Sequence, residues 1–409
     1  MSLLDKASLI LTPNAYNVNK LYSIIPSNGD GDMTFARGTN ATRINSSGVI
    51  ETVGTTIPRL NYDTIGGCPS ILLEPQRTNL LTYSEDFSNS VWIKDNSTIT
   101  TNLINSPNNT LTADKLIENT TTSSHRTFFP YTGTIGSNSL SVYAKAGERV
   151  WIRLSIFDSG TTKICNFNIS NGTIGTNTGL ISYSISLVNG WYKCSITGNI
   201  ANTSCQAQIN IASDDNVTSY TGDGTSGVYI WGAQLETGAY STSYIPTTSS
   251  TVTRNQDIIS RDNIYTKLIT SAGGTWFIEL NNNFSLTRDA ASNGIYLADN
   301  ISVNNGFRIR VTVPGRFVIE KVISATNTQL YATLTDTVKI AFKWNGTSMD
   351  IYVNGTKVVS STAFTFTAME LLSFNATDVP KYIKSMMLFP TPLTDAECIS
   401  LTTLWLKYK

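Results

Sequence analysis

Short runs of alternating apolar and polar residues, separated by turns, dominate the chain from about residue 72 onward. The alternation has a period of two in Ser139–Lys145, and it continues after Gly147 in Val150–Phe157, where every second residue is apolar. This period is typical of a β-strand with one buried face. No helical pattern of useful length interrupts these runs. The sequence therefore predicts an all-β fold of antiparallel sheets and excludes a parallel sheet with helical crossovers.

The last third of the chain repeats the pattern. Strands are expected at Gly274–Leu280, Gly306–Val313, Val338–Trp344, Met349–Val353, Thr356–Val359 and Lys384–Phe389. Asn-Gly pairs at 345–346 and 354–355 separate successive strands, as in tight hairpins. One short helix is expected near the end, because Thr394–Glu397 has the form of a capping box. Its apolar stripe, which should pack on the second sandwich, consists of Cys398, Leu401, Leu404 and Trp405.

The stretch Val228–Asp257 marks a domain boundary. It begins as a strand, and after Pro246 it becomes a Ser/Thr run that is too polar to bury. A chain of 409 residues also exceeds a single core. We therefore expect an extended N-terminal arm (1–71), a first β-sandwich (72–256) and a second β-sandwich (257–409). The arm has too little apolar surface to order alone. It is an anchor and oligomerisation arm, a strap packed on the protein's own sandwich, or each of these in different parts.

Several segments of the first part are similar in sequence to a known group of proteins. These segments are Ala36–Arg43, Gly48–Glu51, Pro58–Asp63, Leu72–Trp92 and Val228–Asp257. Together they resemble the carbohydrate-binding-module-like jelly rolls of bacteriophage fibre and other virion structural proteins, over roughly residues 33–257. The resemblance implies a jelly roll, a place on the virion, and synthesis in the bacterial cytoplasm. It also implies attachment to other capsid or tail proteins through residues 1–71, and a homotrimer, as in phage fibres.

The second sandwich resembles laminin-G-like or concanavalin-like lectin domains. The resemblance rests on the strand meander with Asn-Gly turns, followed by Lys384–Phe389 and Thr391–Glu397. This pattern occurs across a whole superfamily. It implies a lectin-like sandwich, and hence possible adhesion to glycans of a host cell surface.

Composition disfavours several classes of partner. The chain has 29 basic and 29 acidic residues, so it has no basic excess for binding nucleic acid. No apolar run is long enough for a membrane span, and Asp5 and Lys6 stand where a signal peptide needs its apolar core. The five cysteines are odd in number and widely spaced, which predicts free thiols rather than disulfides or a zinc site.

Catalytic motifs are weak or incomplete. The only histidine, His125, lies in a polar Ser/Thr-rich stretch and is expected at the surface. Glu279 is followed by Leu-Asn-Asn-Asn, whereas the concanavalin-like glucanases carry further acids on the comparable strand. Gly222–Gly227 has the letters of a dinucleotide-binding loop, but a strand follows it instead of a helix. We therefore expect no enzyme, no cofactor and no metal. Calcium in the 214–227 loop, near Asp214, Asp215 and Asp223, stays open.

Aromatic residues are the natural candidates for stacking on sugar rings. Five tryptophans lie in strand patterns and are expected in the core: Trp151, Trp191, Trp231, Trp276 and Trp344. Tyr131, Tyr220 and Tyr296 are expected in loops, where they could meet a ligand, but the sequence selects no glycan-binding residue among them.

The sequence thus favours a virion structural protein, a head or tail fibre or appendage, that adheres to host glycans. A capsid decoration or connector protein that binds only viral subunits is the first alternative. A polysaccharide-degrading tail enzyme is the second, and the missing acids disfavour it.

Overall fold

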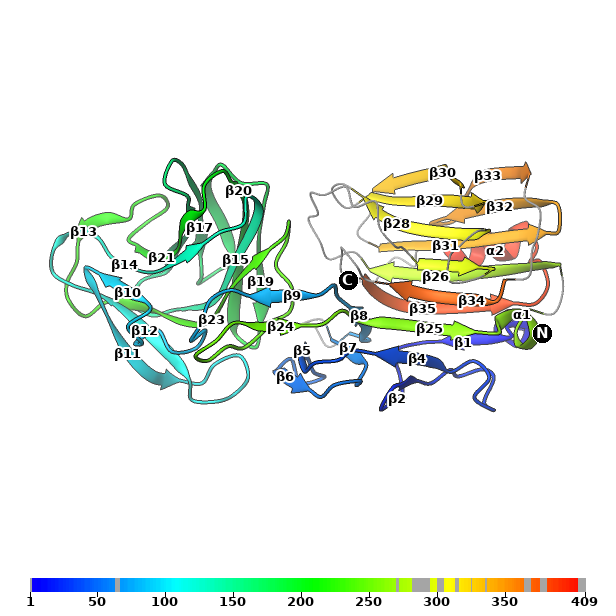
Figure 1. The fold of residues 1–409 in the computed structure, drawn as a ribbon, viewed down its shortest axis with the longest axis horizontal. Coiled ribbons are helices and arrows are strands. Elements are labelled where there is room, and N and C mark those ends of the chain that lie inside the picture. Colours follow the sequence, from blue (N-terminus) through cyan, green and yellow to red (C-terminus); the bar gives the residue numbers. More distant parts are fainter. Residues whose placement is uncertain are drawn as a thin grey trace.

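The chain forms two β-sandwich lobes, which lie side by side along the long axis of the molecule (Figure 1). The computed structural model describes residues 2–62, 67–269, 272–281, 295–299, 305–312, 316–324, 326–334, 337–363, 369–375 and 381–403. We call the lobe that contains strands β10–β23 the middle sandwich. The other lobe, which contains both ends of the described chain, is the terminal sandwich. The prediction of two antiparallel β-sandwiches is confirmed.

The middle sandwich consists of two main antiparallel sheets. One has the order β10 (Ile93–Asp95), β14 (Arg126–Thr132), β21 (Ser204–Ala212), β16 (Trp151–Phe157), β17 (Thr162–Asn168), β18 (Thr173–Thr178). The other has the order β11 (Ser97–Ile104), β12 (Ala113–Glu118), β23 (Gly227–Thr237), β15 (Gly136–Ala146), β20 (Trp191–Ile200), β19 (Ser182–Val188). A small ladder pairs β13 (Thr122–Ser124) with β22 (Ser219–Thr221).

The core of the middle sandwich follows the predicted period of two. In β16, Ile152, Leu154 and Ile156 are fully buried, as the alternation indicated. They belong to one apolar cluster that also contains Trp92 and residues of both main sheets. Burial of this apolar surface is the main force that holds the two sheets together.

The terminal sandwich also has two main sheets within the described residues. The first has the order β33 (Thr356–Ala363), β32 (Ser348–Val353), β31 (Thr337–Asn345), β26 (Gly273–Asn281), β35 (Lys381–Phe389), β8 (Ser70–Leu73), β7 (Arg59–Asn61), and β1 (Leu9–Leu11) also pairs with β35. The second has the order β2 (Tyr16–Asn17), β3 (Lys20–Leu21), β4 (Met33–Ala36), β25 (Ile258–Asp262), β34 (Leu371–Asn375), β27 (Ile295–Ala298), β28 (Gly306–Thr312), β29 (Arg316–Ile323), β30 (Thr326–Leu334).

Residues from both ends of the chain therefore build one lobe. Leu9 in β1 is opposite Leu388 in β35, and Phe35 in β4 is opposite Ile259 in β25. The described part of residues 1–71 forms a strap packed on the protein's own sandwich, which is one of the interpretations left open above. The boundary placed at residue 72 falls within β8. The short apolar runs of the N-terminal part are too small for a core of their own, and β25 and β35 supply the missing partners.

The chain crosses twice between the lobes, and the two crossings lie together. β9 (Arg77–Asn79) leads into the middle sandwich and β24 (Val252–Arg254) leads out of it, and they form an antiparallel ladder. A separate hairpin, β5 (Ala41–Ile44) and β6 (Ile50–Val53), lies beside these crossings in Figure 1. The middle sandwich is thus an insertion into the terminal sandwich.

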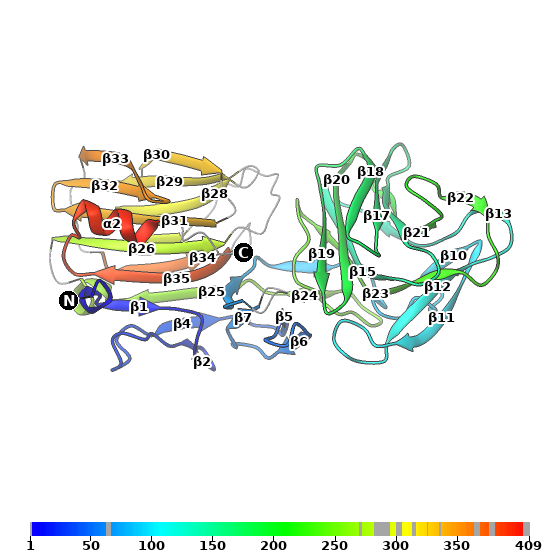
Figure 2. The same cartoon turned by 180° about the vertical axis from the view of Figure 1, so that it is seen from behind.

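The predicted C-terminal helix is confirmed as α2 (Asp395–Thr402). Thr394 and Glu397 form the expected capping box, and the helix lies on the outer face of the sheet that contains β26 and β31 (Figure 2). Cys398 packs there in an apolar cluster with Phe277 and Tyr352, while Leu404 and Trp405 lie outside the described residues. Within the described residues, the other helices are η1 (Leu4–Lys6) and α1 (Ile264–Lys267). No helix in the described ranges has the length and apolarity to cross a membrane.

All five cysteines are free thiols. Cys68 is exposed, whereas Cys165, Cys194, Cys205 and Cys398 are buried. Burial raises the pKa of the Cys165 thiol to about 12. This thiol is therefore protonated at neutral pH and acts as a small apolar side chain.

The position of β4 in the terminal sandwich leads to a first prediction. Phe35 is buried in the core of that lobe, so Phe35→Ala should lower the free energy of unfolding by about 3–5 kcal/mol. The neighbouring Thr34 is exposed, and Thr34→Ala is the matched control, with an effect of about 0.5 kcal/mol or less. Hydrogen–deuterium exchange should become faster in β25 and β34 of Phe35→Ala and stay unchanged in β16 and β21. Unchanged exchange in β25 would contradict this packing.

Candidate functional site

A buried network of charged side chains joins the two lobes. Arg59 of β7 donates to Glu74 (2.6 Å from Nη1 to Oε2) and also pairs with Asp257. Arg254 of β24 binds the same Glu74 oxygen at 2.9 Å, and Arg37 binds the second oxygen of Asp257 at 2.9 Å. All five side chains are at most 2% exposed. They come from four separate parts of the chain that meet where it passes between the lobes.

Glu74 also fixes a loop of the middle sandwich. Its Oε1 accepts from the backbone N–H of Ser243 at 2.7 Å, and its Oε2 accepts from the Ser243 hydroxyl at 2.5 Å. Burial favours a raised pKa for this carboxyl. The guanidinium groups of Arg254 and Arg59 and the hydrogen bonds from Ser243 outweigh burial and hold the pKa well below its ordinary value of 4.5. Glu74 is therefore ionised throughout the neutral range and holds the two lobes in one arrangement.

The segments singled out in the sequence analysis supply this junction. Arg37, Arg59, Glu74, Arg254 and Asp257 all lie within those segments. Asn79, from the same set, donates from its amide to the carbonyls of Ala233 (3.2 Å) and Ile245 (2.9 Å). These segments thus contain residues that hold the two sandwiches together, and they do not by themselves describe a ligand site.

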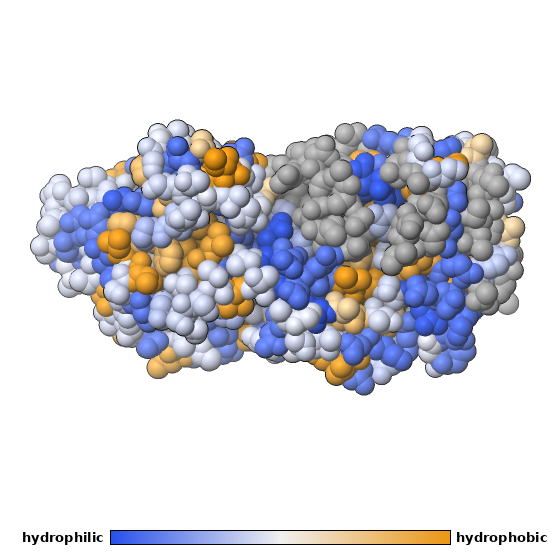
Figure 3. All heavy atoms as spheres, in the orientation of Figure 1, coloured by the Kyte–Doolittle hydropathy of each residue, from blue (hydrophilic) through white to orange (hydrophobic). Residues whose placement is uncertain are grey.

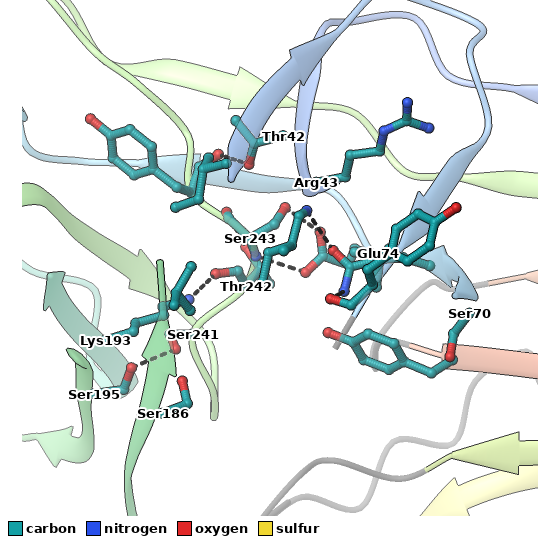
Figure 4. Close-up of a pocket in the computed structure, with 18 of the residues that line it drawn as sticks. Thr42, Arg43, Ser70, Glu74, Ser186, Lys193, Ser195, Ser241, Thr242 and Ser243 are labelled. Carbon is teal, nitrogen blue, oxygen red and sulfur yellow. Dashed lines mark hydrogen bonds between the residues drawn. The ribbon is translucent and has the colours of Figure 1, made fainter. Parts of the chain in front are cut away.

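Next to the network, a cleft of about 430 Å³ lies between the lobes. Figure 4 shows part of its lining, with Lys193, Ser195, Ser241 and Thr242 on one side and Glu74 beyond Ser243. The cleft has a volume typical of small-molecule sites. Its lining residues are Thr42, Arg43, Ile44, Ile50, Asn61, Tyr62, Ser70, Leu72, Glu74, Tyr143, Ser184, Ser186, Leu187, Val188, Lys193, Ser195, Ser241, Thr242, Ser243, Tyr244, Asn281, Tyr382 and Lys384.

The wall from the middle sandwich is rich in hydroxyl groups. The edge strand β19 contributes Ser184 and Ser186, which are exposed, and the adjacent β20 contributes Lys193 and Ser195. The Ser241 hydroxyl donates to the Ser195 hydroxyl at 3.0 Å. These groups can exchange hydrogen bonds with the hydroxyls of a ligand.

The wall from the terminal sandwich supplies aromatic rings and a cation. Tyr62 follows β7, while Tyr382 and Lys384 lie in β35, and all three side chains are partly exposed. The Lys384 ammonium donates to the carbonyl of Cys68 at 2.8 Å. On the face drawn in Figure 3, hydrophilic residues gather at the waist between the lobes. The cleft lining therefore combines hydroxyl groups, cations and tyrosine side chains.

The aromatic residues singled out in the sequence lie elsewhere. Trp191, Trp231, Trp276 and Trp344 are fully buried, which confirms the prediction for these four, while Trp151 is partly exposed. The three tyrosines expected in loops are in strands instead: Tyr131 in β14, Tyr220 in β22 and Tyr296 in β27. The expectation of free loop tyrosines is wrong, because strand pairing extends through these polar stretches.

His125 is buried, and its expected place at the surface is wrong. Its ring packs against Tyr220, with 4.8 Å between the ring centroids. Nδ1 lies 2.8 Å from the carbonyl oxygen of Asn96, and Nε2 lies 3.2 Å from that of Tyr220. The polar Ser/Thr-rich sequence around His125 gave no sign that β13 and β22 cover it.

The acidic residues of the 214–227 loop accept hydrogen bonds from separate groups. The carboxylate of Asp215 accepts from Thr176, that of Asp214 from the Asp215 backbone, and that of Asp223 from Ser226. In the described part of the chain, no three His, Cys, Asp or Glu residues form a group that could hold a metal ion. Glu279 lies in β26 and accepts from the Ser385 hydroxyl at 3.2 Å.

No protein-family model matches the chain, and no curated protein sequence matches it. Among solved structures, the chain is similar to domain 4 of AbnA, a GH43 extracellular arabinanase from Geobacillus stearothermophilus, in complex with arabinotriose. That likeness has 14% identity and a TM-score of 0.28, and it covers 40% of this chain and 82% of that domain.

Two further solved structures are similar. The binding domain of botulinum neurotoxin DC, in complex with SialylT, has 14% identity and a TM-score of 0.27 over 36% of this chain and 39% of that one. Domains LG4-5 of the mouse laminin α1 chain have 7% identity and a TM-score of 0.23 over 67% of this chain and 90% of that one. The fold is defined by the strand topology of the chain itself.

The charge network leads to a second prediction. Glu74→Gln should lower the free energy of unfolding at pH 7 by about 3–5 kcal/mol, because it leaves Arg59 and Arg254 buried without their shared anion. Glu51→Gln is the control, since Glu51 pairs with Arg43 in a partly exposed position. This substitution should lower the free energy of unfolding by about 1 kcal/mol or less.

The pH dependence follows from the lowered pKa of Glu74. The stabilisation is complete above the ordinary pKa of 4.5 and is lost as the pH falls towards the lower pKa of the folded state. The difference between wild type and Glu74→Gln should therefore shrink below about pH 5. Denaturant unfolding at a series of pH values measures it, and a difference that grows on acidification would contradict the role of Glu74.

Proposed function

We propose that this chain is a structural protein of a bacteriophage virion, of the fibre or appendage type, and that the cleft between its lobes binds a glycan. The observation that carries the glycan proposal is the lining of the cleft, in which hydroxyl groups on one wall face tyrosine rings and a lysine on the other. The resemblance of residues 33–257 to virion proteins supports the place on the virion. Attachment to other capsid or tail proteins through residues 1–71 belongs to the same proposal.

Sugars match this lining in two ways. Their hydroxyls exchange hydrogen bonds with groups such as Ser186 and Ser241, while their C–H faces pack on aromatic rings such as Tyr62 and Tyr382. The buried charge network also fixes both walls before a ligand arrives. A preorganised site loses less entropy on binding, which favours a useful affinity for a small polar ligand.

The charge arrangement disfavours a polysaccharide-degrading enzyme. Glycoside hydrolysis usually requires two carboxyl groups on either side of the bond that breaks. Glu74 is the one carboxylate among the described residues that line the cleft. Its oxygens are taken by Arg59, Arg254 and Ser243, and its low pKa makes it a poor proton donor. We therefore propose adhesion without catalysis.

A large side chain that fills the cleft should weaken glycan binding. Ser186 is exposed on β19 and lines the cleft, so Ser186→Trp should weaken glycan binding at least tenfold, or about 1.4 kcal/mol. Ser219→Trp is the matched control, because Ser219 is also an exposed serine on a strand but does not line the cleft. A glycan array identifies ligands, and biolayer interferometry of both variants measures affinity.

Three outcomes of this experiment separate the alternatives. Loss of binding in Ser186→Trp alone supports the cleft. A chain that binds no glycan but joins particles would favour a decoration or connector protein. Release of reducing sugar from a bound polysaccharide would show an enzyme.

We also propose that the protein is a homotrimer. A virion appendage gains avidity from several copies, and the equal numbers of acidic and basic residues give no net repulsion between chains. The choice of three copies rests on the resemblance to phage fibres. Multi-angle light scattering at micromolar concentration should give three times the chain mass of 44.6 kDa. A mass equal to one chain would show that assembly requires the particle.

A further inference from the structure

We propose that the ligand of the cleft is an acidic glycan, and that the ammonium group of Lys193 binds the carboxylate of a sugar acid. This inference rests on the proposed function and names its ligand class. Three observations support it: the position of Lys193, the partners of the neighbouring carboxylates, and the balance of charge around Lys193.

Lys193 lies in the wall that the middle sandwich provides. It pairs with Ser186 across β19 and β20, and both residues line the cleft. Its Nζ donates to the carbonyl of Thr242 at 2.6 Å, and it lies 6.0 Å from the centroid of the Tyr143 ring. An ammonium group has three N–H donors, so the Thr242 carbonyl leaves capacity for an anionic ligand.

The nearby carboxylates use their oxygens elsewhere. Both oxygens of Glu74 bind within the junction, as described above. The Glu236 carboxylate accepts from the backbone N–H of Thr242 at 2.8 Å and from its hydroxyl at 2.5 Å. Glu236 and Glu74 attract the Lys193 ammonium through space without a direct hydrogen bond to it, and Arg254 repels it. Among the described residues, no carboxylate therefore occupies the position at the ammonium that a ligand would take.

The balance of charge points the same way. The junction holds the cations Arg37, Arg59 and Arg254 and the anions Glu74 and Asp257, and Glu236 adds a third anion beside Thr242. Lys193 is then a fourth cation against three anions. Burial lowers the pKa of Lys193, which reflects the cost of holding this charge away from water. An anion in the cleft would offset that cost.

The donor type selects a carboxylate over a phosphate. Phosphate sites usually have a guanidinium fork or several backbone N–H groups that share the larger charge. Here the guanidinium groups of Arg59 and Arg254 are occupied by Glu74, and the Arg43 guanidinium is occupied by Glu51 and Tyr16. The Lys193 ammonium, with hydroxyl groups around it, suits a monoanion that also carries hydroxyls, as uronic and nonulosonic acids do.

The test uses the full-length protein on an array that contains neutral, carboxylated and sulfated glycans. The expected hits carry a carboxylate, and methyl esterification of that carboxylate should weaken binding at least tenfold. Lys193→Gln should cause a similar loss, whereas Lys193→Arg, which keeps the charge, should retain measurable binding. Lys145→Gln is the control, because Lys145 is an exposed lysine of the adjacent strand β15 and does not line the cleft.

Each outcome decides one question. Hits that are all neutral or all sulfated, or carboxylated hits whose binding survives both esterification and Lys193→Gln, would overturn the acidic ligand while leaving the glycan function intact. An array with no hits would overturn the proposed function itself. If Lys193→Gln is destabilised, as thermal unfolding would reveal, the comparison of each carboxylated glycan with its methyl ester on the wild-type protein still decides the proposal.

Discussion

The arrangement of the two lobes depends on one buried set of charges, in which Glu74 and Asp257 hold three guanidinium groups. Each ion loses its hydration on folding, and the set is stable only because every charge meets an opposite charge at hydrogen-bond distance. Its members come from the N-terminal strands, from both crossings between the lobes and from the start of β25. The network can therefore form only when all these segments are in place, and it makes the junction specific as well as stable.

The cleft is a consequence of this junction. Neither lobe contains it alone, because β19 and β20 provide one wall and β35, with the residue after β7, provides the other. Glu74 lines the cleft, but its negative charge is neutralised by Arg59 and Arg254. Lys193 lies at the edge of the same charge system without a bonded carboxylate. The groups that hold the lobes together thus also determine which electrostatic character the cleft presents to a ligand.

The inserted topology has a consequence for folding. β1 pairs with β35, so residues 9–11 must meet residues 386–388 before the sheet is complete. The middle sandwich, by contrast, is built from one continuous stretch and contains its own core. Pairing across nearly the whole chain carries a high entropic cost of loop closure. A folded middle sandwich shortens the effective loop, because β9 and β24 hold its two ends side by side.

The sequence by itself determined the features that depend on neighbouring residues. A period of two placed β15, β16 and β26, the Asn354-Gly355 pair gave a hairpin turn with positive φ at both residues (47° and 82°), and Thr394 with Glu397 marked the start of α2. Only the tertiary structure decided where residues 2–62 pack, that His125 is buried, and that Lys193 and Lys384 face one cleft. These outcomes depend on which distant strands pair, and the periodicity of a single strand carries no information about its partner.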